Sequence, residues 1–288
     1  MSAPWGSPMK AKRKLKIWNI VVLAYVLLLA GILLHDLTGR AGEEEPGLSP
    51  ASQLEQLPPV DPVDPDIPDQ APAADPLASP QEEGPVLALT FDDGPSANVT
   101  SELVAALNER GAKATFFMLG VNAQAYPKLV QFVQESGHQV ASHGWDHAHY
   151  LTDLNETQLA AELSQADEAI YAAIGEYPAY LRPPYGAMDR TTAARIDKPM
   201  MLWTIDPRDW EVRDSQAVCD HIVENAYDGG VVIAHDNYQT TLDGVICAVD
   251  ILAQQGYRFV TLEEYYEIFD IQPQPGVVYR GTLLADIP

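Results

Sequence analysis

The chain has 288 residues and is strongly acidic, with 41 Asp and Glu residues against 17 Lys and Arg residues and a net charge of −24. From Val86 onward, 11 basic and 29 acidic residues give a net charge of −18. Such a charge argues against nucleic acid and anionic membrane surfaces as partners of this part of the chain. Its roughly 200 residues are enough for one sizeable hydrophobic core.

The first 35 residues have the pattern of a membrane anchor. Segment 1–16 contains five basic residues and no acidic ones, and an almost wholly apolar run, Ile17–Leu34, follows it. As a helix this run would span about 27 Å, close to the hydrocarbon thickness of a bilayer. The positive-inside rule places segment 1–16 in the cytoplasm, segment 17–35 in the membrane and the remainder outside the cell. We therefore expect a single-pass protein of the cell membrane.

A cleaved signal peptide is the alternative, and it would leave a secreted protein. The small-residue cleavage site that a signal peptide requires is poor here, since Gly39 and Ala41 bracket Arg40. Both alternatives export the bulk of the chain.

Segment 36–85 is predicted to be a disordered linker. Residues 41–85 include eleven prolines and eleven acidic residues, with no Lys or Arg. Such a stretch has too few apolar residues to offset the entropy lost on folding. Proline and like-charge repulsion keep it extended. The segment is thus expected to tether a folded domain, residues 86–288, to the membrane.

Strand-like and helix-like segments alternate after residue 85. The predicted strands are Val86–Thr90, Ala114–Phe117, Gln139–Ser142, Tyr180–Leu181, Met200–Thr204, Val231–Ala234 and Arg258–Val260. The predicted helices are Thr100–Arg110, Pro127–Ser136, Thr157–Ile174, Ser215–Tyr227 and Leu242–Gln255. This alternation predicts an α/β fold with a parallel sheet covered by helices. About seven such units favour a barrel over an open sheet.

Two features of the domain have alternative interpretations. Cys219 and Cys247 lie in successive predicted helices. Outside the cytoplasm they could form a disulfide, and two buried free thiols are the alternative. Segment 267–288 is either a terminal strand with a packed tail or a disordered end.

Polar residues follow most of the predicted strands. In chain order they are Asp92, Asp93, His143, Arg182, Asp206, Asp209 and His235. The carboxyl ends of parallel barrel strands form one face, where active sites lie. We therefore expect these side chains to converge. Because side chains alternate along a strand, the neighbours Asp92 and Asp93 are expected to point in different directions and to have different roles.

The residue types at this face suit metal-assisted hydrolysis. His143 and His147 are four residues apart, a spacing that puts both imidazoles on one face of a helical turn. The spacing alone is as typical of two exposed histidines. With a carboxylate from Asp92 or Asp93, the pair would give two His and one carboxylate and an open position, which suits zinc and other divalent metals. The second Asp could act as a base and His235 as an acid.

Three further histidines lack this context and are expected at the surface or in supporting positions: His138, His149 and His221.

Five stretches follow one another along the chain: Thr90–Pro95, His143–His147, Arg182–Gly186, Asp206–Trp210 and Ile233–His235. In this order they resemble the five motifs of the polysaccharide deacetylase (NodB-homology) family, which is carbohydrate esterase family four. The resemblance covers roughly Val86 to Leu262, and five ordered motifs are more specific than any one alone. It implies a distorted (β/α) barrel with about seven parallel strands. Together with the N-terminal segments, it is similar to membrane-anchored peptidoglycan N-acetylglucosamine deacetylases.

The resemblance also implies a role for each site residue. Asp93, His143 and His147 would hold a divalent metal, with zinc preferred and cobalt, nickel or manganese as alternatives. Asp92 would be the general base, oriented by Arg182.

The remaining implied roles concern the acid and the substrate. His235 would be the general acid, tuned by Asp206. The backbone N–H of Tyr185 would stabilise the oxyanion, Trp210 and Ile233 would line the pocket for the acetyl methyl group, and Asp209 would lie at the substrate. The chain departs from the usual motifs at Gly144, where Ser or Thr is common, and at Ile233, where Leu is usual.

The activity implied is metal-dependent removal of acetyl groups from N-acetylglucosamine units of a polysaccharide. Peptidoglycan is the first substrate expected, chitin-type oligomers the second and O-acetylated xylan the third. The Arg182–Gly186 stretch resembles N-acetylglucosamine deacetylases more than those acting on N-acetylmuramic acid, which often differ at the Tyr185 position. An inactive sugar-binding relative is the alternative of another class, but all expected ligand, acid and base residues are present. The oligomeric state is not indicated.

Overall fold

The computed structural model describes residues 84–288, which lie within one compact unit that starts at Ala78. The predicted segments 1–16 and 17–35, and nearly all of 36–85, fall outside the described residues. Within residues 84–288, no helix combines the length and the apolar character needed to cross a membrane.

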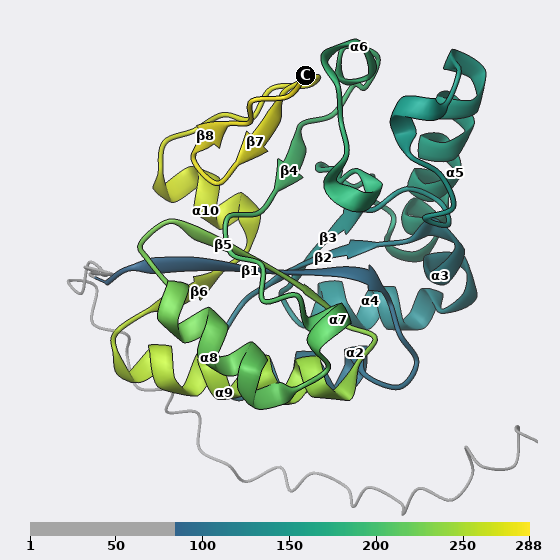
Figure 1. The fold of residues 1–288 in the computed structure, drawn as a ribbon. Coiled ribbons are helices and arrows are strands. Elements are labelled where there is room, and N and C mark those ends of the chain that lie inside the picture. Colours follow the sequence, from purple (N-terminus) through teal and green to yellow (C-terminus); the bar gives the residue numbers. More distant parts are fainter. Residues whose placement is uncertain (1–83) are drawn as a thin grey trace, which may run out of the picture. The chain divides into compact units, whose positions relative to one another are not determined.

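A parallel sheet built around β1 (Val86–Gly94) forms the centre of this unit (Figure 1). Its order is β3-β2-β1-β5, with β6 also paired to β1. The other strands are β2 (Thr115–Met118), β3 (Gln139–Ser142), β5 (Gly230–His235) and β6 (Arg258–Val260). Strands β2 and β6 pair with different halves of β1, which therefore has three strand neighbours.

A smaller three-stranded sheet has the order β4-β7-β8. It consists of β4 (Met200–Leu202), β7 (Val278–Arg280) and β8 (Leu283–Leu284). Single parallel bridges connect it to the larger sheet, from Ser142 to Leu181, from Leu181 to Met200 and from Ile205 to Val232. The predicted strand Tyr180–Leu181 is thus present only as isolated bridges. The α/β class and the parallel sheet are confirmed, but no continuous strand ladder closes the described residues into a barrel.

Helices cover both faces of the large sheet. The longer ones are α2 (Thr100–Asn108), α4 (Pro127–Glu135), α5 (Glu156–Ile174), α8 (Ser215–Asn225) and α9 (Gln239–Gln254). The shorter ones are α3 (Gly120–Ala125), α6 (Arg190–Ala193), α7 (Asp209–Val212) and α10 (Leu262–Ile268), with 3-10 turns η2 (Leu151–Asp153) and η3 (Pro184–Gly186). Figure 1 shows α2, α4, α8 and α9 below the sheet and α10 above it.

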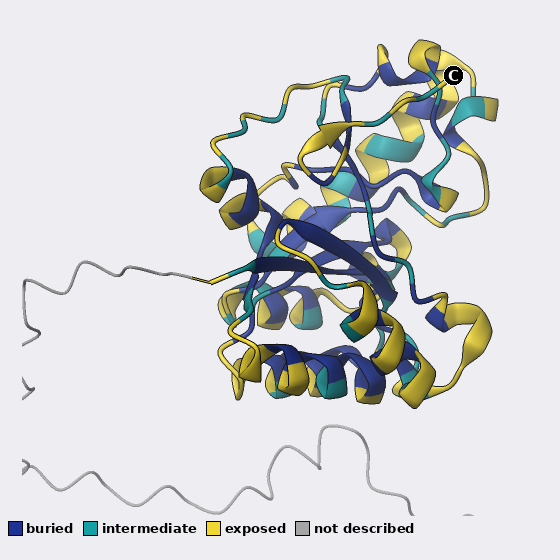
Figure 2. Ribbon diagram, turned by 60° about the vertical axis from the view of Figure 1, so that its left-hand side comes forward, coloured by how far each residue is buried: buried dark blue, intermediate teal, exposed yellow. Residues whose placement is uncertain are grey.

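Strand β1 separates two hydrophobic cores, which explains its continuous apolar sequence. Leu87, Leu89 and Phe91 pack in the larger core, together with residues of α2, α4, α8 and α9. Val86 and Ala88 face a second core that includes tyrosines of α10. Figure 2 shows the strand buried along its length and the helices exposed only on their outer sides. Strands buried on both faces lack the alternation of apolar and polar residues.

Local sequence signals account for the ends of several helices. Asn155 and Gln158 form a capping box at the start of α5, and Gly175 ends that helix with a φ of 77°. Gly111 and Gly137, which follow the segments of α2 and α4, also have positive φ values, 64° and 80°. Glycine adopts this left-handed conformation without the steric cost of a Cβ atom.

The C-terminal segment 267–288 packs on the fold, as the first of its two interpretations held. Val278 and Tyr279 are buried in β7, which pairs parallel with β4. Leu283 and Leu284 of β8 are exposed.

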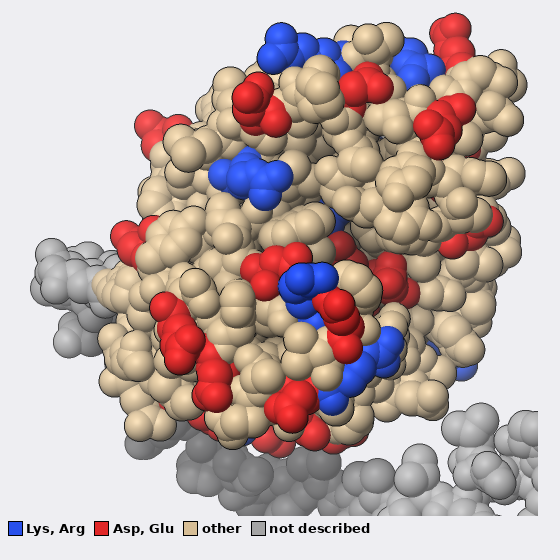
Figure 3. Space-filling model, viewed as in Figure 1, with Lys and Arg blue, Asp and Glu red and all other residues tan. Residues whose placement is uncertain are grey.

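Acidic side chains are spread over the face of the unit shown in Figure 3, with fewer basic side chains between them. This distribution agrees with the negative charge of the sequence.

A disulfide joins Cys219 of α8 to Cys247 of α9, with 5.7 Å between their Cα atoms. Of the two alternatives for these cysteines, the structure has the cross-link. Cys219 is fully buried within the larger core. The bond therefore ties together two helices that cover one face of the sheet.

We predict that reducing this disulfide destabilises the domain. A sequence separation of 28 residues corresponds to about 3–4 kcal/mol of loop entropy removed from the unfolded state. Urea unfolding with and without reductant, after alkylation confirms that both thiols are free, should show this loss. An unchanged midpoint in the fully alkylated protein would contradict the prediction.

Candidate active site

The predicted polar residues do converge at the carboxyl ends of the central strands. Asp92 and Asp93 lie near the end of β1, His143 directly follows β3, and His235 is the last residue of β5. Asp92 and His235 are paired positions of the β1–β5 ladder. The site therefore forms where the sequence placed it.

A β-bulge at Asp93 brings both aspartates to the same side of β1. The register of the β1–β2 ladder shifts between Asp92 and Gly94, and Asp93 has a φ of 73°. The Oδ2 atom of Asp92 and the Oδ1 atom of Asp93 lie 3.7 Å and 3.6 Å from Nε2 of His143. The expected divergence of the two side chains is thus wrong, because a bulge interrupts the alternation on which it depended. Asn122 supports this conformation, since its Nδ2 donates a 2.8 Å hydrogen bond to the Asp93 carbonyl.

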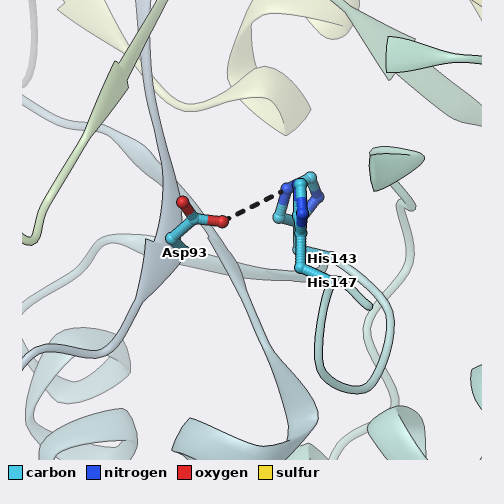
Figure 4. A group of neighbouring side chains, drawn as sticks. All are labelled: Asp93, His143 and His147. Atoms are coloured by element: carbon cyan, nitrogen blue, oxygen red, sulfur yellow. Dashed lines mark ion pairs between the residues drawn. The ribbon is translucent and has the colours of Figure 1, made fainter. Parts of the chain in front are cut away.

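Asp93, His143 and His147 form a group that could hold a metal ion (Figure 4). One ligand atom from each lies within 4.8 Å of the others. The Oδ1 atom of Asp93 is buried and has no hydrogen-bond partner among the described residues. A buried carboxylate oxygen without a donor is costly unless a cation or water satisfies it. Two imidazoles and one carboxylate are also the donor set of many catalytic divalent-metal sites, so the residues fit a metal.

His143 is oriented and kept neutral for such a role. The carbonyl oxygen of Arg182 lies 2.8 Å from Nδ1 of His143. We assign the proton to Nδ1, which donates to this carbonyl and leaves the Nε2 lone pair facing Asp93. Burial lowers the pKa of His143, and the charges of Asp92 and Asp93 only oppose this effect. Metal binding requires the neutral imidazole.

The loop that carries both histidines is not the helical turn expected from their spacing. Residues 143–147 form an irregular loop in which Gly144 and His147 have positive φ values of 79° and 60°. Tyr185 fixes the far end, because its hydroxyl donates a 2.9 Å hydrogen bond to the His147 carbonyl. Its ring centroid also lies 4.2 Å from that of His147. The positive φ values in the loop and the contact with Tyr185 therefore bring the two imidazole rings close together.

Asp92 forms a buried ion pair with Arg182. Nη1 of Arg182 donates hydrogen bonds to Oδ1 of Asp92 at 2.7 Å and to Oγ1 of Thr90 at 2.8 Å. Asp92 is 2% exposed and Arg182 is fully buried. The pairing implied by the resemblance is confirmed. It occupies one oxygen of Asp92 and leaves Oδ2 directed at Nε2 of His143.

The carboxylate beside His235 belongs to Asp209, and the expectation that Asp206 fills this role is wrong. Oδ1 of Asp209 lies 2.9 Å from Nδ1 of His235, while Oδ2 accepts the His235 backbone N–H at 2.8 Å and the Thr241 hydroxyl at 2.7 Å. Asp206 instead accepts the backbone N–H of Arg208 at 2.9 Å. Arg208 has a φ of 54°, and this bend carries the chain from Asp206 to the buried start of α7.

Asp209 determines the charge of His235. Burial by itself would lower the pKa of His235, but the hydrogen bond and charge of Asp209, with the charges of Asp92 and Asp93, raise it to about 9. Asp209 is itself fully buried. His235 bonded to this carboxylate therefore carries a proton at neutral pH.

The other predicted substrate residues border the site with different exposures. Trp210 is 48% exposed and Tyr185 is 51% exposed, whereas Ile233 is buried. Ile233 precedes His235 by two residues in β5 and so lies on the same side of that strand.

Two buried residues near these elements were not correctly anticipated. Asp236 is fully buried behind the bulge; burial raises its pKa to about 7, and a hydrogen bond from Thr100 opposes this. A Cβ atom on Gly94 would lie 2.4 Å from its carboxylate oxygens, so the aspartate needs a glycine there. His138 is 4% exposed and packs edge-on against Phe116, so of its two expected positions the surface one is wrong. His149 and His221 are exposed.

Comparison with known proteins gives a consistent result. A family model described as polysaccharide deacetylase matches residues 79–199. A peptidoglycan-N-acetylglucosamine deacetylase of Listeria monocytogenes is 38% identical over 180 residues, covering 62% of this chain and 38% of that protein. A peptidoglycan-N-acetylmuramic acid deacetylase of Bacillus subtilis is 31% identical, covering 69% of this chain and 44% of that protein. The chain thus spans less than half the length of these two curated relatives.

A solved structure described as the T48 deacetylase with substrate is also similar. It is 35% identical, and the alignment covers 68% of this chain and 96% of that one with a TM-score of 0.65.

We predict that the pKa of His235 in the metal-free protein depends on Asp209 and not on Asp206. Asp209→Asn removes the charge that favours the imidazolium, so the His235 pKa should fall from about 9 toward the ordinary value of about 6.5. NMR titration of the histidine ring signals measures this. Asp206→Asn is the matched control and should leave the His235 pKa near that of the wild type. A lowered pKa in Asp206→Asn with an unchanged pKa in Asp209→Asn would instead support Asp206 as the partner of His235.

Proposed function

The chain belongs to the polysaccharide deacetylase family, and we propose that it is a metal-dependent enzyme that removes N-acetyl groups from N-acetylglucosamine units of a cell-envelope polysaccharide. One observation carries the proposal. Three metal-ligand side chains lie beside an aspartate held by a buried arginine and a histidine held by a buried aspartate. This arrangement supplies every group that amide hydrolysis requires.

Asp93, His143 and His147 are the residues that would hold the metal. When bound there, a divalent ion supplies Lewis-acid polarisation of the acetyl carbonyl and makes coordinated water more acidic. We propose zinc as the resident ion, because a site of two histidines and one carboxylate with an open position suits it. Cobalt, nickel and manganese are alternatives, because such ligands do not select one metal strictly.

Asp92 is proposed to be the general base. Hydrolysis of an acetamide requires removal of a proton from the attacking water as its oxygen joins the carbonyl carbon. Oδ1 of Asp92 is engaged by Arg182, while Oδ2 faces the metal ligands. Arg182 thus fixes the carboxylate so that Oδ2 is the oxygen that would take the proton.

His235 is proposed to be the general acid. The C–N bond breaks only if the departing sugar nitrogen receives a proton, because an amide anion is a poor leaving group. Asp209 holds Nδ1 of His235 and so leaves the Nε2 proton free for transfer. Acetate and a sugar amine are then the products. The pairing of Asp92 with His235 across the β1–β5 ladder supports proton removal and delivery on neighbouring strands.

The backbone N–H of Tyr185 is proposed to help stabilise the developing oxyanion, and Trp210 and Ile233 to contact the acetyl methyl group. Tyr185 has a φ of 63° and lies in η3 immediately after two prolines, so its peptide is held in one orientation. Such preorganised donors are a large contribution to acyl-transfer catalysis. Trp210 is half-exposed at the start of α7, where a sugar could reach it.

Peptidoglycan is the proposed substrate, and N-acetylglucosamine the proposed unit. Both curated relatives described above act on peptidoglycan according to their names, one on each of its two sugars. The higher identity to the N-acetylglucosamine enzyme favours that sugar. Chitin-type oligomers and acetylxylan are alternative substrates, and an inactive sugar-binding protein is the alternative of another class. The intact set of ligand, base and acid residues favours an enzyme.

Two proposals on architecture and location accompany this function. We propose that the strands form a distorted barrel, because the single bridges at Leu181 and Ile205 link the small sheet to β3 and β5. We also propose that segment 17–35 anchors the protein in the cell membrane with segment 1–16 in the cytoplasm, which the sequence pattern supports. The domain would then act outside the cell.

We expect Asp92→Asn to lower kcat of deacetylation by about 10²–10⁴-fold, because the amide cannot take the proton of the attacking water. Acetate release from purified peptidoglycan measures the loss. Asp220→Asn, an exposed substitution on α8, is the control and should retain wild-type turnover. Undiminished activity of Asp92→Asn would refute the assignment of the base.

We expect the purified protein to release acetate from peptidoglycan faster than from chitin oligomers or acetylxylan. Chelation should abolish the release, and added Zn²⁺ should restore it, because the ligand set fits a divalent ion. Activity on acetylxylan alone would identify an esterase. Binding of glycans without acetate release from any of the three, in the zinc-loaded protein, would favour the sugar-binding alternative.

A further inference from the structure

The loop between the two histidine ligands is held on one side by the first turn of α3. The backbone N–H groups of Gly120 and Val121 each donate a 2.9 Å hydrogen bond, to the carbonyl oxygens of Gly144 and Trp145 respectively. These two acceptors are consecutive peptide groups that lie between His143 and His147. The carbonyl side of the loop is therefore fixed by backbone alone.

The opposite side of the loop is held by a side chain of α5. Oε1 of Glu162 accepts a 2.7 Å hydrogen bond from the Trp145 backbone N–H. Glu162 is half-buried, unlike several exposed polar side chains of the same helix. A donor on one side and an acceptor on the other thus clamp the Trp145 peptide region between α3 and α5.

The sequence makes room for this contact at two glycines. A Cβ atom on Gly144 would lie 3.1 Å from Oε1 of Glu162, and Gly144 has a φ of 79° that disfavours other residues. A Cβ atom on Gly120 would lie 2.6 Å from both the Trp145 ring and the backbone of Ala166. The absence of a side chain at Gly144 thus lets Glu162 reach the loop, and its absence at Gly120 lets α5 and the Trp145 ring pack closely against α3.

From this geometry we propose that Glu162 is a positioning residue, which holds the loop so that His143 and His147 present their nitrogen atoms together with Asp93 and thereby sets the metal affinity. Neither the position in α5 nor the five motifs assign Glu162 a role. The inference rests on the proposed function only in that it requires this site to bind a divalent metal.

Two substitutions of Glu162 distinguish the effect of side-chain length from the effect of charge. Glu162→Gln keeps an oxygen acceptor at the same distance and loses the charge. Glu162→Asp keeps the charge and shortens the side chain by one methylene, so the carboxylate no longer reaches the Trp145 N–H. Loss of a group that orients metal ligands typically weakens metal binding by about 10–100-fold. A positioning role therefore predicts weak binding in Glu162→Asp and Glu162→Ala, and near-wild-type binding in Glu162→Gln.

The test is the Zn²⁺ affinity of the metal-free full-length chain, measured by competition with a chromogenic chelator and without reference to activity. We expect Glu162→Asp and Glu162→Ala to bind Zn²⁺ about 10-fold or more weakly, and Glu162→Gln to lie within about threefold of the wild type, since its acceptor remains. Glu168→Ala is the matched control, because Glu168 lies on the same helix and bonds only to the Tyr177 hydroxyl. It should bind as the wild type does. Circular dichroism of each metal-free variant shows whether it is folded. If Glu162→Ala does not fold, Glu162→Asp provides the test.

The outcomes are distinct. Equal affinity in the wild type, Glu162→Asp and Glu162→Ala would overturn the positioning role while leaving the proposed function intact. Weak binding by Glu162→Gln with normal binding by Glu162→Asp would show a charge effect and would equally overturn it. Failure of the wild type itself to bind Zn²⁺, or Co²⁺ in the same assay, would refute the proposed metal-dependent function and this inference with it.

Discussion

The rest of the site depends on the contacts of one buried group, the guanidinium of Arg182. It donates to Asp92 and Thr90 of β1 and to the Met201 carbonyl of β4, and it lies 4.1 Å from the Phe117 ring centroid of β2. Its backbone carbonyl oxygen accepts a hydrogen bond from Nδ1–H of His143. One residue therefore connects three strands, the proposed base Asp92 and the proposed metal ligand His143. Removing one partner of such a buried pair typically costs about 3–5 kcal/mol, so fold and site cannot be altered independently here.

The site keeps groups of opposite charge close together by giving each its own counter-ion. Arg182 forms an ion pair with Asp92, and Asp209 forms one with His235. Each of these partners is fully buried, and hydrogen bonds hold each in place. Distinct environments for a base and an acid are how one site maintains both protonation states at one pH. The proposed division of roles thus depends on Arg182 and Asp209 as much as on Asp92 and His235 themselves.

Patterns along the chain predicted the α/β class, most of the helices and the convergence of the polar residues. Hydrophobic runs and helix-ending glycines such as Gly111 depend on local backbone chemistry, which a sequence reports directly. The bulge at Asp93 depends on the register between β1 and β2, which no local pattern specifies. The choice between Asp206 and Asp209 depends on the left-handed backbone of Arg208. The sequence does not indicate this conformation, because Gly, Asn and Asp are the residues that usually adopt it. The sequence did not predict a role for Glu162, because an acidic residue on an amphipathic helix is normally solvent-exposed.

Asp92 and His235 are directly paired positions of two neighbouring strands, so changes in the strands and changes in the connecting loops have different effects on the site. Their relative position is set by the β1–β5 ladder, whose six paired positions run from Leu87 to Asp92. The surfaces that a long polymer would touch are supplied by connections such as the one that carries Tyr150, which is 46% exposed beside Tyr185. Insertions or exchanges in those connections leave the ladder register unchanged. The architecture therefore allows selectivity for a glycan to diversify by loop replacement while the proton-transfer geometry stays constant.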